Sequence, residues 1–343
     1  MEYWKEVNKK LKPWVDAGLN KTVIDLFAGC GGLSLGFEAN GFKTIGYEID
    51  KQASDTYNKN LIGECFNQAL TVDTKYPKAD VVIGGPPCQP FSVGGKQLGL
   101  KDSRDGFPIF LSAIRQLNPE VLLFENVRGI LYKNKWYLKE VIEELESLGY
   151  YINYALLNAV NYEVPQNRER VIVIGSKQKI SLPRKVERKV TVGQALGELA
   201  FQFDENSKFF TESMDRYVAN YEKASKCVNP RDLYLDRPAR TLTCRNLAGA
   251  TGDMHRVRLK DGRRRRITVR EAARLQSFPD WFEFSGTETN QYNQIGNAVA
   301  PNFAYHLALN IKKHLLGETE NQYITTENEQ LKLFENEAIY QSR

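Results

Sequence analysis

Short apolar runs alternate with amphipathic stretches through the first half of the chain. The apolar runs fall at residues 22–26, 43–48, 79–83 and 120–127. They are rich in Val, Ile and Leu, which is typical of strands that are buried on both faces of a parallel sheet. Helical periodicity appears between these runs at residues 33–40 and 105–117, and after the last of them at 135–148. The alternation predicts an α/β fold whose ligands bind at the carboxyl ends of the strands.

The pattern loses its regularity in the second half. Two more strands are predicted at 151–160 and 170–175, after which polar, weakly periodic segments run from about residue 184 to residue 264. Such a region is either a small second domain or disordered, and the alternation at 233–246 favours a folded one. A last helix is predicted to end near His314.

Residues 1–20 carry an amphipathic pattern of their own. Trp4, Val7, Leu11 and Trp14 recur at helical spacing, with lysines between them. The spacing predicts a helix that packs on the main domain, and a helix that binds a partner is the alternative.

Composition narrows the class of protein. With 343 residues the chain exceeds the usual size of a single core, which favours one large domain and one smaller one. The net charge of +5 permits nucleic-acid binding without requiring it. Five cysteines without paired spacing and only three histidines argue against a disulfide framework and a zinc site. No apolar run reaches membrane-spanning length and no signal-peptide core follows Met1, so we expect a soluble protein in a reducing compartment.

A glycine turn follows the first predicted strand. Gly29, Gly31 and Gly32 would let the backbone approach a bound group closely, and a helix begins directly after them. Such a turn alone is a weak signal, because dehydrogenases and many other α/β proteins have one. Glu48 ends the second strand about twenty residues further on, where a carboxylate can bind ribose hydroxyls. The two features together predict a cofactor that contains adenosine.

Cys88 follows the third apolar run in the segment Gly-Gly-Pro-Pro-Cys-Gln-Pro-Phe-Ser. Pro86 and Pro87 restrict the backbone ahead of the thiol and hold it out from the end of the strand. The residues from Phe91 to Lys101 are glycine-rich and basic, which predicts a mobile loop that closes over a polyanion. A buried structural thiol is the alternative, but this surrounding favours a nucleophile.

Charged groups also stand at the ends of later strands. Glu125 concludes an apolar run, where burial would favour its protonated form and make it a general acid; a salt-bridged strand-end acid is the alternative. Arg168 and Arg170 are separated by one residue, so we expect both to point to the same face of an entering strand. Ordinary surface ion pairing is the alternative for these two arginines.

Several of these segments resemble, in the usual order, the motifs of the C5 cytosine-specific DNA methyltransferases. The matching stretches are Asp-Leu-Phe-Ala-Gly-Cys-Gly-Gly, Pro-Pro-Cys-Gln-Pro-Phe-Ser, Phe-Glu-Asn-Val, Gln-x-Arg-x-Arg and Gln-x-Gly-Asn-Ala-Val. The resemblance covers about residues 22 to 311. It implies a Rossmann-like S-adenosylmethionine-dependent methyltransferase domain and a smaller target-recognition domain. We therefore expect an N-terminal extension at 1–21, a catalytic domain at 22–183 that is completed by 290–316, the recognition domain and hinge at 184–289, and a tail at 317–343.

The resemblance also implies which residues form the site. The catalytic residues would be Cys88, Glu125, Arg168 and Arg170. The cofactor-binding residues would be Phe27, Ala28, Gly29, Gly31, Gly32, Leu33, Glu48, Ile49, Asn67, Gln68, Pro86, Asn297 and Ala298. The chemistry of their side chains adds candidate DNA-binding residues: Gln89, Ser92 and Arg104 around the loop after Cys88, and Arg245 and Arg256, whose guanidinium groups can bind base edges and phosphates. Thr241 belongs to a Thr-Leu pair like that of the family's target-recognition domain. No metal is expected.

The implied reaction is methylation of cytosine C5 in duplex DNA. The Cys88 thiolate would add to C6 of a flipped-out cytosine while Glu125 donates to N3, and C5 would then accept the methyl group. The enzyme would act as a monomer on double-stranded DNA in the bacterial cytoplasm, associated with the nucleoid. It would be the modification enzyme of a restriction-modification system whose endonuclease acts independently. A tRNA cytosine methyltransferase and a catalytically silent DNA-binding regulator are the alternatives.

Two positions depart from the family pattern. Asn67 and Gln68 stand where family members usually have an aspartate that accepts from the adenine amino group, and either amide could replace it. Glu163 stands where the family usually has glycine, which would alter the turn and place a negative charge near DNA.

The arginine run at 263–266 is expected to clamp a phosphate; a nuclear signal and a solvated turn are the alternatives.

Overall fold

The structure is a computed structural model that describes residues 2–87, 105–132, 134–224, 226, 232–249 and 253–318. Four residues that the sequence assigns to the site lie outside the described residues: Cys88, Gln89, Ser92 and Arg104. Most of the tail predicted from residue 317 lies outside them as well.

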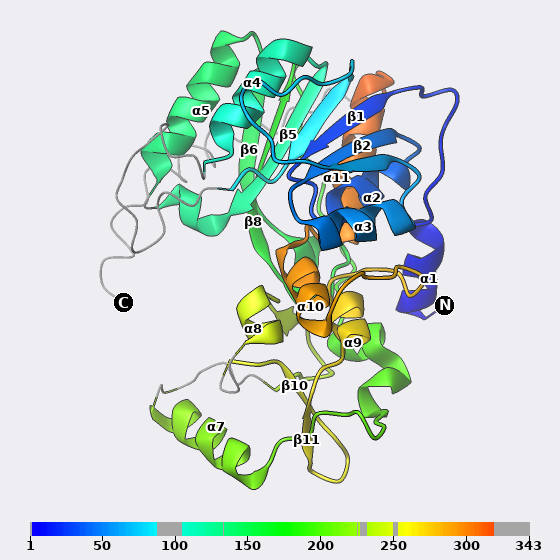
Figure 1. Ribbon diagram of the computed structural model, residues 1–343, viewed down its shortest axis with the longest axis vertical. Helices are drawn as coiled ribbons and strands as arrows, with labels where there is room; N and C mark the ends of the chain where they lie inside the picture. The colour runs from blue at the N-terminus through cyan, green and yellow to red at the C-terminus, as the bar shows by residue number, and fades with distance from the viewer. Residues whose placement is uncertain are drawn as a thin grey trace.

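A seven-stranded sheet forms the centre of the upper part of the molecule (Figure 1), in the order β3-β2-β1-β4-β5-β8-β6. Its strands are β1 Thr22–Leu26, β2 Lys43–Glu48, β3 Glu64–Asn67, β4 Val81–Gly84, β5 Val121–Val127, β6 Tyr151–Asn158 and β8 Glu169–Ser176. The first five strands pair in parallel, and β8 runs antiparallel to both β5 and β6. The predicted α/β fold is confirmed. β3 was not predicted, because Cys65 is its one buried residue and it therefore has no apolar run.

Helices cover both faces of this sheet, which is why its strands read as continuous apolar runs. α2 Gly32–Glu38 and α11 Pro301–Leu315 pack on one face, and α4 Phe107–Leu117 and α5 Lys135–Ser147 pack on the other (Figure 1). α3 Lys51–Asn60 lies against β2 and β3. Alternate residues of β5 divide between the two faces, with Leu123 in the α2–α11 core and Phe124 in the α4–α5 core. A Cβ at Gly36 would lie 2.4 Å from the backbone of Ala304, so glycine permits the close crossing of α2 and α11.

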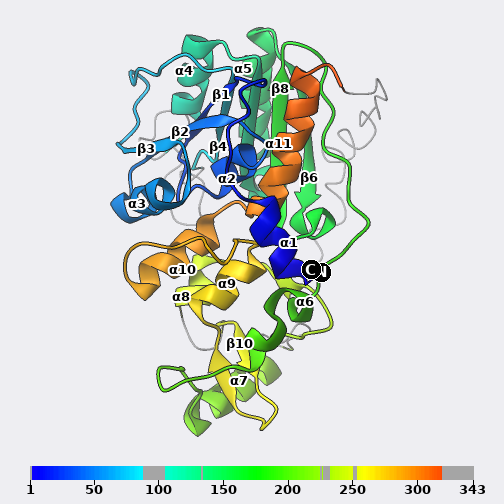
Figure 2. The same ribbon diagram turned by 90° about the vertical axis from the view of Figure 1, so that its right-hand side faces the viewer.

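A second lobe lies beyond the ends of the strands (Figures 1 and 2). Its helices and strands are α6 Val192–Leu196, η5 Gly197–Phe201, α7 Glu212–Ala224, β9 Ala239–Arg240, α8 Cys244–Ala248, β10 Arg256–Arg258, β11 Arg264–Arg266 and α9 Val269–Leu275. Its buried side chains form a cluster that includes Val192, Leu247, Val257 and Ile267. The described part of 184–264 is thus folded, although it was too irregular for its elements to be predicted singly. The domain boundaries given above stay a prediction.

Two segments join the two parts. α10 Glu288–Asn297 lies between the sheet and α8, and the short strand β7 Gln166–Asn167 pairs with β9. The remaining one-turn helices are η3 Arg128–Leu131, directly after β5, and η4 Ala159–Tyr162, directly after β6.

The N-terminal helix α1 is shorter than predicted, at Tyr3–Lys10, and Trp14 lies outside it. In both views it lies at the junction of the two parts (Figures 1 and 2). It packs against α6, and the Asn8 carbonyl accepts from Trp281 Nε1 at 3.1 Å. The prediction that it packs on the main domain is therefore incomplete, because it contacts the second lobe as well. Among the described residues no helix is long and apolar enough to cross a membrane.

Candidate active site

A cavity of about 820 Å³ opens at the carboxyl ends of β1, β2, β4 and β5 and extends to α10. This is the edge at which open α/β sheets bind ligands. Eleven of the predicted cofactor residues line it: Phe27, Ala28, Gly29, Gly32, Leu33, Glu48, Ile49, Gln68, Pro86, Asn297 and Ala298. Glu125 lines the same cavity.

The turn after β1 holds a carboxylate at the cavity wall. Gly29 N donates to one oxygen of Glu48 and Asp50 N donates to the other, each at 2.8 Å. Gly29 has φ +57°. Phe27 has φ +62°, a backbone conformation that is rare for a residue with a side chain. Such strain costs about 1–3 kcal/mol and is concentrated at functional sites. The turn therefore fixes the Phe27 ring and the Glu48 carboxylate beside the space that a ligand would enter.

The structure separates the two amides that replace the family aspartate. Asn67 Nδ2 donates to the carbonyls of Glu48 and Ile49, at 3.1 and 2.9 Å, and Asn67 does not line the cavity. Gln68 does line it. Gln68 is therefore the amide in position to meet a ligand, and Asn67 holds the end of β2 in place.

Gly31 also lies outside the lining of the cavity. Its φ is +86°, and a Cβ there would lie 2.8 Å from the Tyr57 ring. Glycine at this position permits the left-handed conformation of the turn and the close packing of Tyr57 in α3.

Several lining residues were not predicted. Asn290, Asn293 and Gln294 precede Asn297 at helical spacing in α10, so one face of that helix borders the cavity. That spacing was the signal that could have identified them. Asp25 also lines the cavity, and its carboxylate accepts from Ser34 Oγ at 2.7 Å. Burial raises the pKa of Asp25 to about 7.

Glu125 is paired across the sheet. Its Oε1 lies 2.6 Å from Arg170 Nε, and each side chain is 12% exposed. Glu125 is opposite Ile172 in the β5–β8 ladder, so Arg170 is its diagonal neighbour on the same face. The sequence predicted a buried acid that holds a proton, with a salt-bridged strand-end acid as the alternative, and the structure shows the ion pair of that alternative.

The segment that leads into Cys88 runs past this pair. Pro86 and Pro87 line the cavity, and Asn126 Nδ2 donates to Pro86 O at 3.0 Å. A Cβ built on Gly85 would lie 4.0 Å from Glu125 Oε2. The end of β5 therefore holds the Pro-Pro segment beside the Glu125 carboxylate.

Arg168 does not share the position of Arg170, which corrects the expectation that both point to one face. Its side chain is buried, and its guanidinium donates to the carbonyls of Leu242, Gly296 and Ala298 at 2.8, 3.2 and 2.9 Å. Alternation holds only along a continuous strand, and Arg168 falls between β7 and β8. Burial lowers the pKa of Arg168. This arginine joins the second lobe to the segment that ends α10.

The predicted DNA-binding residues of the second lobe differ in exposure. The Arg245 side chain is 83% exposed, and Thr241 Oγ1 donates to Asn167 O at 2.6 Å. Arg256 is a correction, because its side chain is fully buried and pairs with Glu222, at 2.7 Å, and with Asp232. In this conformation Arg256 stabilises the lobe and cannot reach DNA.

The arginine run at 263–266 is not a phosphate clamp in this structure. Arg264 pairs with Asp215 and Asp232, and the buried Arg265 pairs with buried Glu271 at 2.7 Å. Arg266 donates to the carbonyl of Leu247. Arg264 thus neutralises acids that lie 49 and 32 residues away in sequence, a pairing that the local charge pattern could not reveal.

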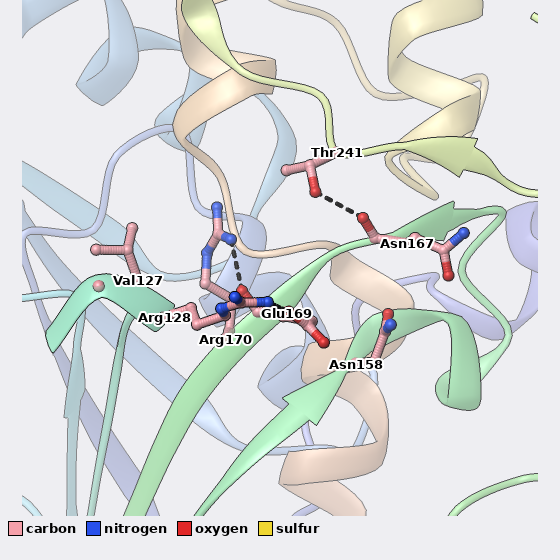
Figure 3. A pocket seen from close by; sticks show the side chains of 8 residues that line it. Val127, Arg128, Asn158, Asn167, Glu169, Arg170 and Thr241 are labelled. Atoms are coloured by element: carbon pink, nitrogen blue, oxygen red, sulfur yellow. Dashed lines mark hydrogen bonds and ion pairs between the residues drawn. The ribbon is translucent and has the colours of Figure 1, made fainter. Parts of the chain in front are cut away.

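A second, open cavity of about 540 Å³ lies between the two parts of the molecule (Figure 3). It is lined by Val127, Arg128, Gly129, Asn158, Asn167, Glu169, Arg170 and Thr241. Val127 and Arg170 connect it to the Glu125 site, because Val127 lines both cavities and Arg170 bonds to Glu125. Among the described residues no group of three His, Cys, Asp or Glu could hold a metal ion.

Comparison with known proteins decides the family. A family model described as C-5 cytosine-specific DNA methylase matches residues 21–313. The chain belongs to this family. This DNA methylase is 52% identical over 340 residues to the Type II methyltransferase M.AplI of Arthrospira platensis, an alignment that covers 97% of this chain and 98% of the relative. It is 32% identical over 352 residues to the Type II methyltransferase M.FnuDI of Fusobacterium nucleatum, covering 91% and 99% of the two chains.

Solved structures share its fold. A putative DNA modification methyltransferase encoded within an E. coli prophage is 25% identical, with a TM-score of 0.63 over 87% of this chain and all of that one. The Entamoeba histolytica methyltransferase EhMeth is 19% identical, with a TM-score of 0.67 over 88% and 99% of the two chains. The enzyme is thus a DNA cytosine-5-methyltransferase with a Rossmann-like methyltransferase fold.

Proposed function

We propose that this DNA methylase transfers a methyl group from S-adenosylmethionine to C5 of a cytosine flipped out of duplex DNA, through a covalent adduct with Cys88. One observation carries the proposal. Glu125, which pairs with Arg170, lines the same cavity as Glu48 and the Pro86-Pro87 segment. An acid, a cofactor-binding carboxylate and the residues leading into a cysteine are therefore gathered around one space.

The residues of the cavity fit an adenosine-containing cofactor. The Glu48 carboxylate, held by two backbone N–H groups, can accept from ribose hydroxyls. Phe27 offers an aromatic face, Ile49 offers a side chain that is 72% exposed, and Gln68 offers an amide for the adenine amino group. When bound, S-adenosylmethionine would supply a methyl group on a positively charged sulfur. Asp25 lines the same cavity, where burial raises its pKa to about 7, so this carboxyl is only partly ionised at neutral pH.

The chain's own residues would activate the base. The Cys88 thiolate adds to C6 of cytosine, and Glu125 supplies a hydrogen bond or proton at N3, which makes C5 nucleophilic. C5 would then take the methyl group and lose its proton to water, while the C6–S bond breaks to release the thiolate and any proton held at N3 returns to Glu125, which restores the aromatic ring. Arg170 would hold Glu125 and meet the cytosine carbonyl. Arg168 has a positioning role, because both of its terminal guanidinium nitrogens donate to backbone carbonyls.

The substrate would be double-stranded DNA. A stacked base cannot reach Glu125, so the cytosine must leave the helix, at a cost of a few kcal/mol. Thr241 and the exposed Arg245, with Gln89, Ser92 and Arg104, are the proposed DNA contacts. The names of the relatives support a Type II modification enzyme. As further parts of the proposal, the enzyme acts as a monomer in the bacterial cytoplasm, and a separate endonuclease recognises the same site.

Transfer of tritiated methyl groups tests the proposal. We expect duplex DNA to be labelled, and Cys88→Ala to abolish labelling while cofactor binding persists. Duplexes that contain 5-fluorocytosine should become covalently trapped on the wild-type enzyme in the presence of the methyl donor, since the fluorine cannot leave as a proton does. Labelling of tRNA alone would favour the tRNA methyltransferase, and DNA binding without any labelling would favour the silent regulator.

A further inference from the structure

The second cavity has the chemistry of a phosphate site. Eight residues line it, and they include two guanidinium groups, two amides and a hydroxyl (Figure 3). Glu169 is the one acid among these eight. Such a set of donors matches the oxygens of a phosphodiester, which arginine binds through two parallel hydrogen bonds.

Its location fits the DNA backbone. The cavity is bordered by η3 and β8 on the catalytic side and by Thr241 on the side of the second lobe. Arg128 follows Glu125 by three residues at the end of β5, and Val127 between them lines both cavities. A nucleotide whose base approaches Glu125 would therefore carry its phosphate toward Arg128.

Arg128 forms an ion pair with Glu169 at the second cavity, and a ligand could replace this carboxylate. Its Nη1 lies 2.7 Å from Glu169 Oε2, and the two side chains are 45% and 40% exposed. The guanidinium also lies 5.4 Å from the centroid of the Tyr132 ring, which keeps it directed along this surface. Exposed ion pairs of this kind contribute little, so a phosphate can displace the carboxylate at small cost.

We propose that Arg128 binds a backbone phosphate of the substrate DNA beside the flipped cytidine, and that Glu169 occupies the phosphate position in the free enzyme. This inference rests on the proposed function, because it takes duplex DNA as the substrate. It adds a phosphate-contacting residue and a competing acid, neither of which belongs to the predicted site.

The chain offers a matched control. Arg115 Nη2 lies 2.7 Å from Glu144 Oε1 between α4 and α5, with the two side chains 48% and 39% exposed. Neither residue lines either cavity. Arg115→Gln and Glu144→Gln therefore make the same change of net charge in a pair of nearly identical geometry away from the proposed phosphate.

Equilibrium binding of a short duplex of random sequence, titrated with salt, tests the proposal in the full-length enzyme. Each lost phosphate contact lowers the slope of log affinity against log salt by about 0.9. We expect this loss for Arg128→Gln, with the ratio of wild-type to variant affinity falling about threefold between 50 and 200 mM salt. Arg128→Lys should retain most of the slope. Glu169→Gln should tighten binding, whereas Arg115→Gln and Glu144→Gln should not change it.

Three outcomes would overturn the inference. These are equal salt slopes for wild type and Arg128→Gln, equal losses for Arg128→Gln and Arg115→Gln, or unchanged binding in Glu169→Gln. Unfolding temperatures show whether each variant is folded, and Glu169→Gln, compared with Glu144→Gln, preserves the test if Arg128→Gln is not folded. Methyl transfer by the wild-type enzyme separates the two proposals. If the wild-type enzyme labels DNA and Arg128→Gln binds DNA as the wild type does, the proposed function stands and only this inference is wrong.

Discussion

The Glu163 carboxylate lies 2.6 Å from the ammonium group of Lys10, so the turn after η4 is tied to the end of the N-terminal helix. Glu163 has φ +57°, a conformation that suits the glycine usual in the family. Its carbonyl accepts from Tyr3 OH at 2.6 Å. Its carboxylate also lies 3.6 Å from Arg188. The negative charge that was expected near DNA is therefore paired within the protein, and Glu163 anchors α1.

Substitution of Glu163 sets two effects against each other. Glutamine keeps the left-handed backbone and loses the charge-assisted bonds, so Glu163→Gln should lower the free energy of unfolding by about 2 kcal/mol. Glycine loses the same bonds but relieves about 1 kcal/mol of backbone cost, so Glu163→Gly should be destabilised by about half as much. Urea unfolding measures both. Lys10→Met should have little further effect in the Glu163→Gln background; full additivity would contradict the pairing.

Substitutions of Arg168 and of Arg170 should have different effects. Arg168→Lys cannot supply a planar fork to three buried carbonyls, so it should lower stability by at least about 2 kcal/mol. Arg170→Lys keeps a charge beside Glu125 and should unfold near the wild-type temperature, with slower methyl transfer. Thermal unfolding and single-turnover kinetics provide the two readouts. Equal stability losses would show that both arginines serve the fold.

The two amides near the cavity should differ in their effect on the cofactor. Gln68 lines the cavity, so Gln68→Ala should lose one hydrogen bond, about 1 kcal/mol or roughly fivefold in Kd for S-adenosylmethionine. Asn67 is turned to the carbonyls of Glu48 and Ile49, so Asn67→Ala should weaken binding less. Titration calorimetry of both variants measures the difference. A larger loss for Asn67→Ala would reverse the assignment.

His255 should make the folded protein sensitive to acid. Burial, reinforced by the charge of Arg240, lowers the pKa of His255 to about 3. The unfolded chain takes up a proton below about pH 6.5 while the folded protein stays neutral there, so stability is present above pH 6.5 and falls as the pH drops. The expected loss is about 2 kcal/mol between pH 8 and pH 5. Urea unfolding across this range should show a smaller loss in His255→Gln; an unchanged pH dependence would place the proton elsewhere.

Much of the fold was readable from the sequence because its signals are local. Buried parallel strands are continuous apolar runs, and the predicted strands at 43–48 and 120–127 coincide with β2 and nearly with β5. The glycine turn, Glu48 and the segment up to Pro87 gather at one edge, since the carboxyl ends of parallel strands must meet there. The short strand β3 was not predicted, because most of its residues are exposed and it has no apolar run.

The sequence alone determined the order of the motifs, the α/β scaffold and the set of residues that its strand ends deliver to the cavity. The tertiary structure decided which charged side chains form ion pairs or hydrogen bonds within the protein. Arg168 and Arg170 look equivalent in sequence, yet one donates to Leu242 and the other pairs with Glu125. Arg256 looks like a DNA contact, yet Asp232 and Glu222 bury it. A guanidinium is committed by partners that folding brings from distant segments, and local periodicity carries no record of those partners.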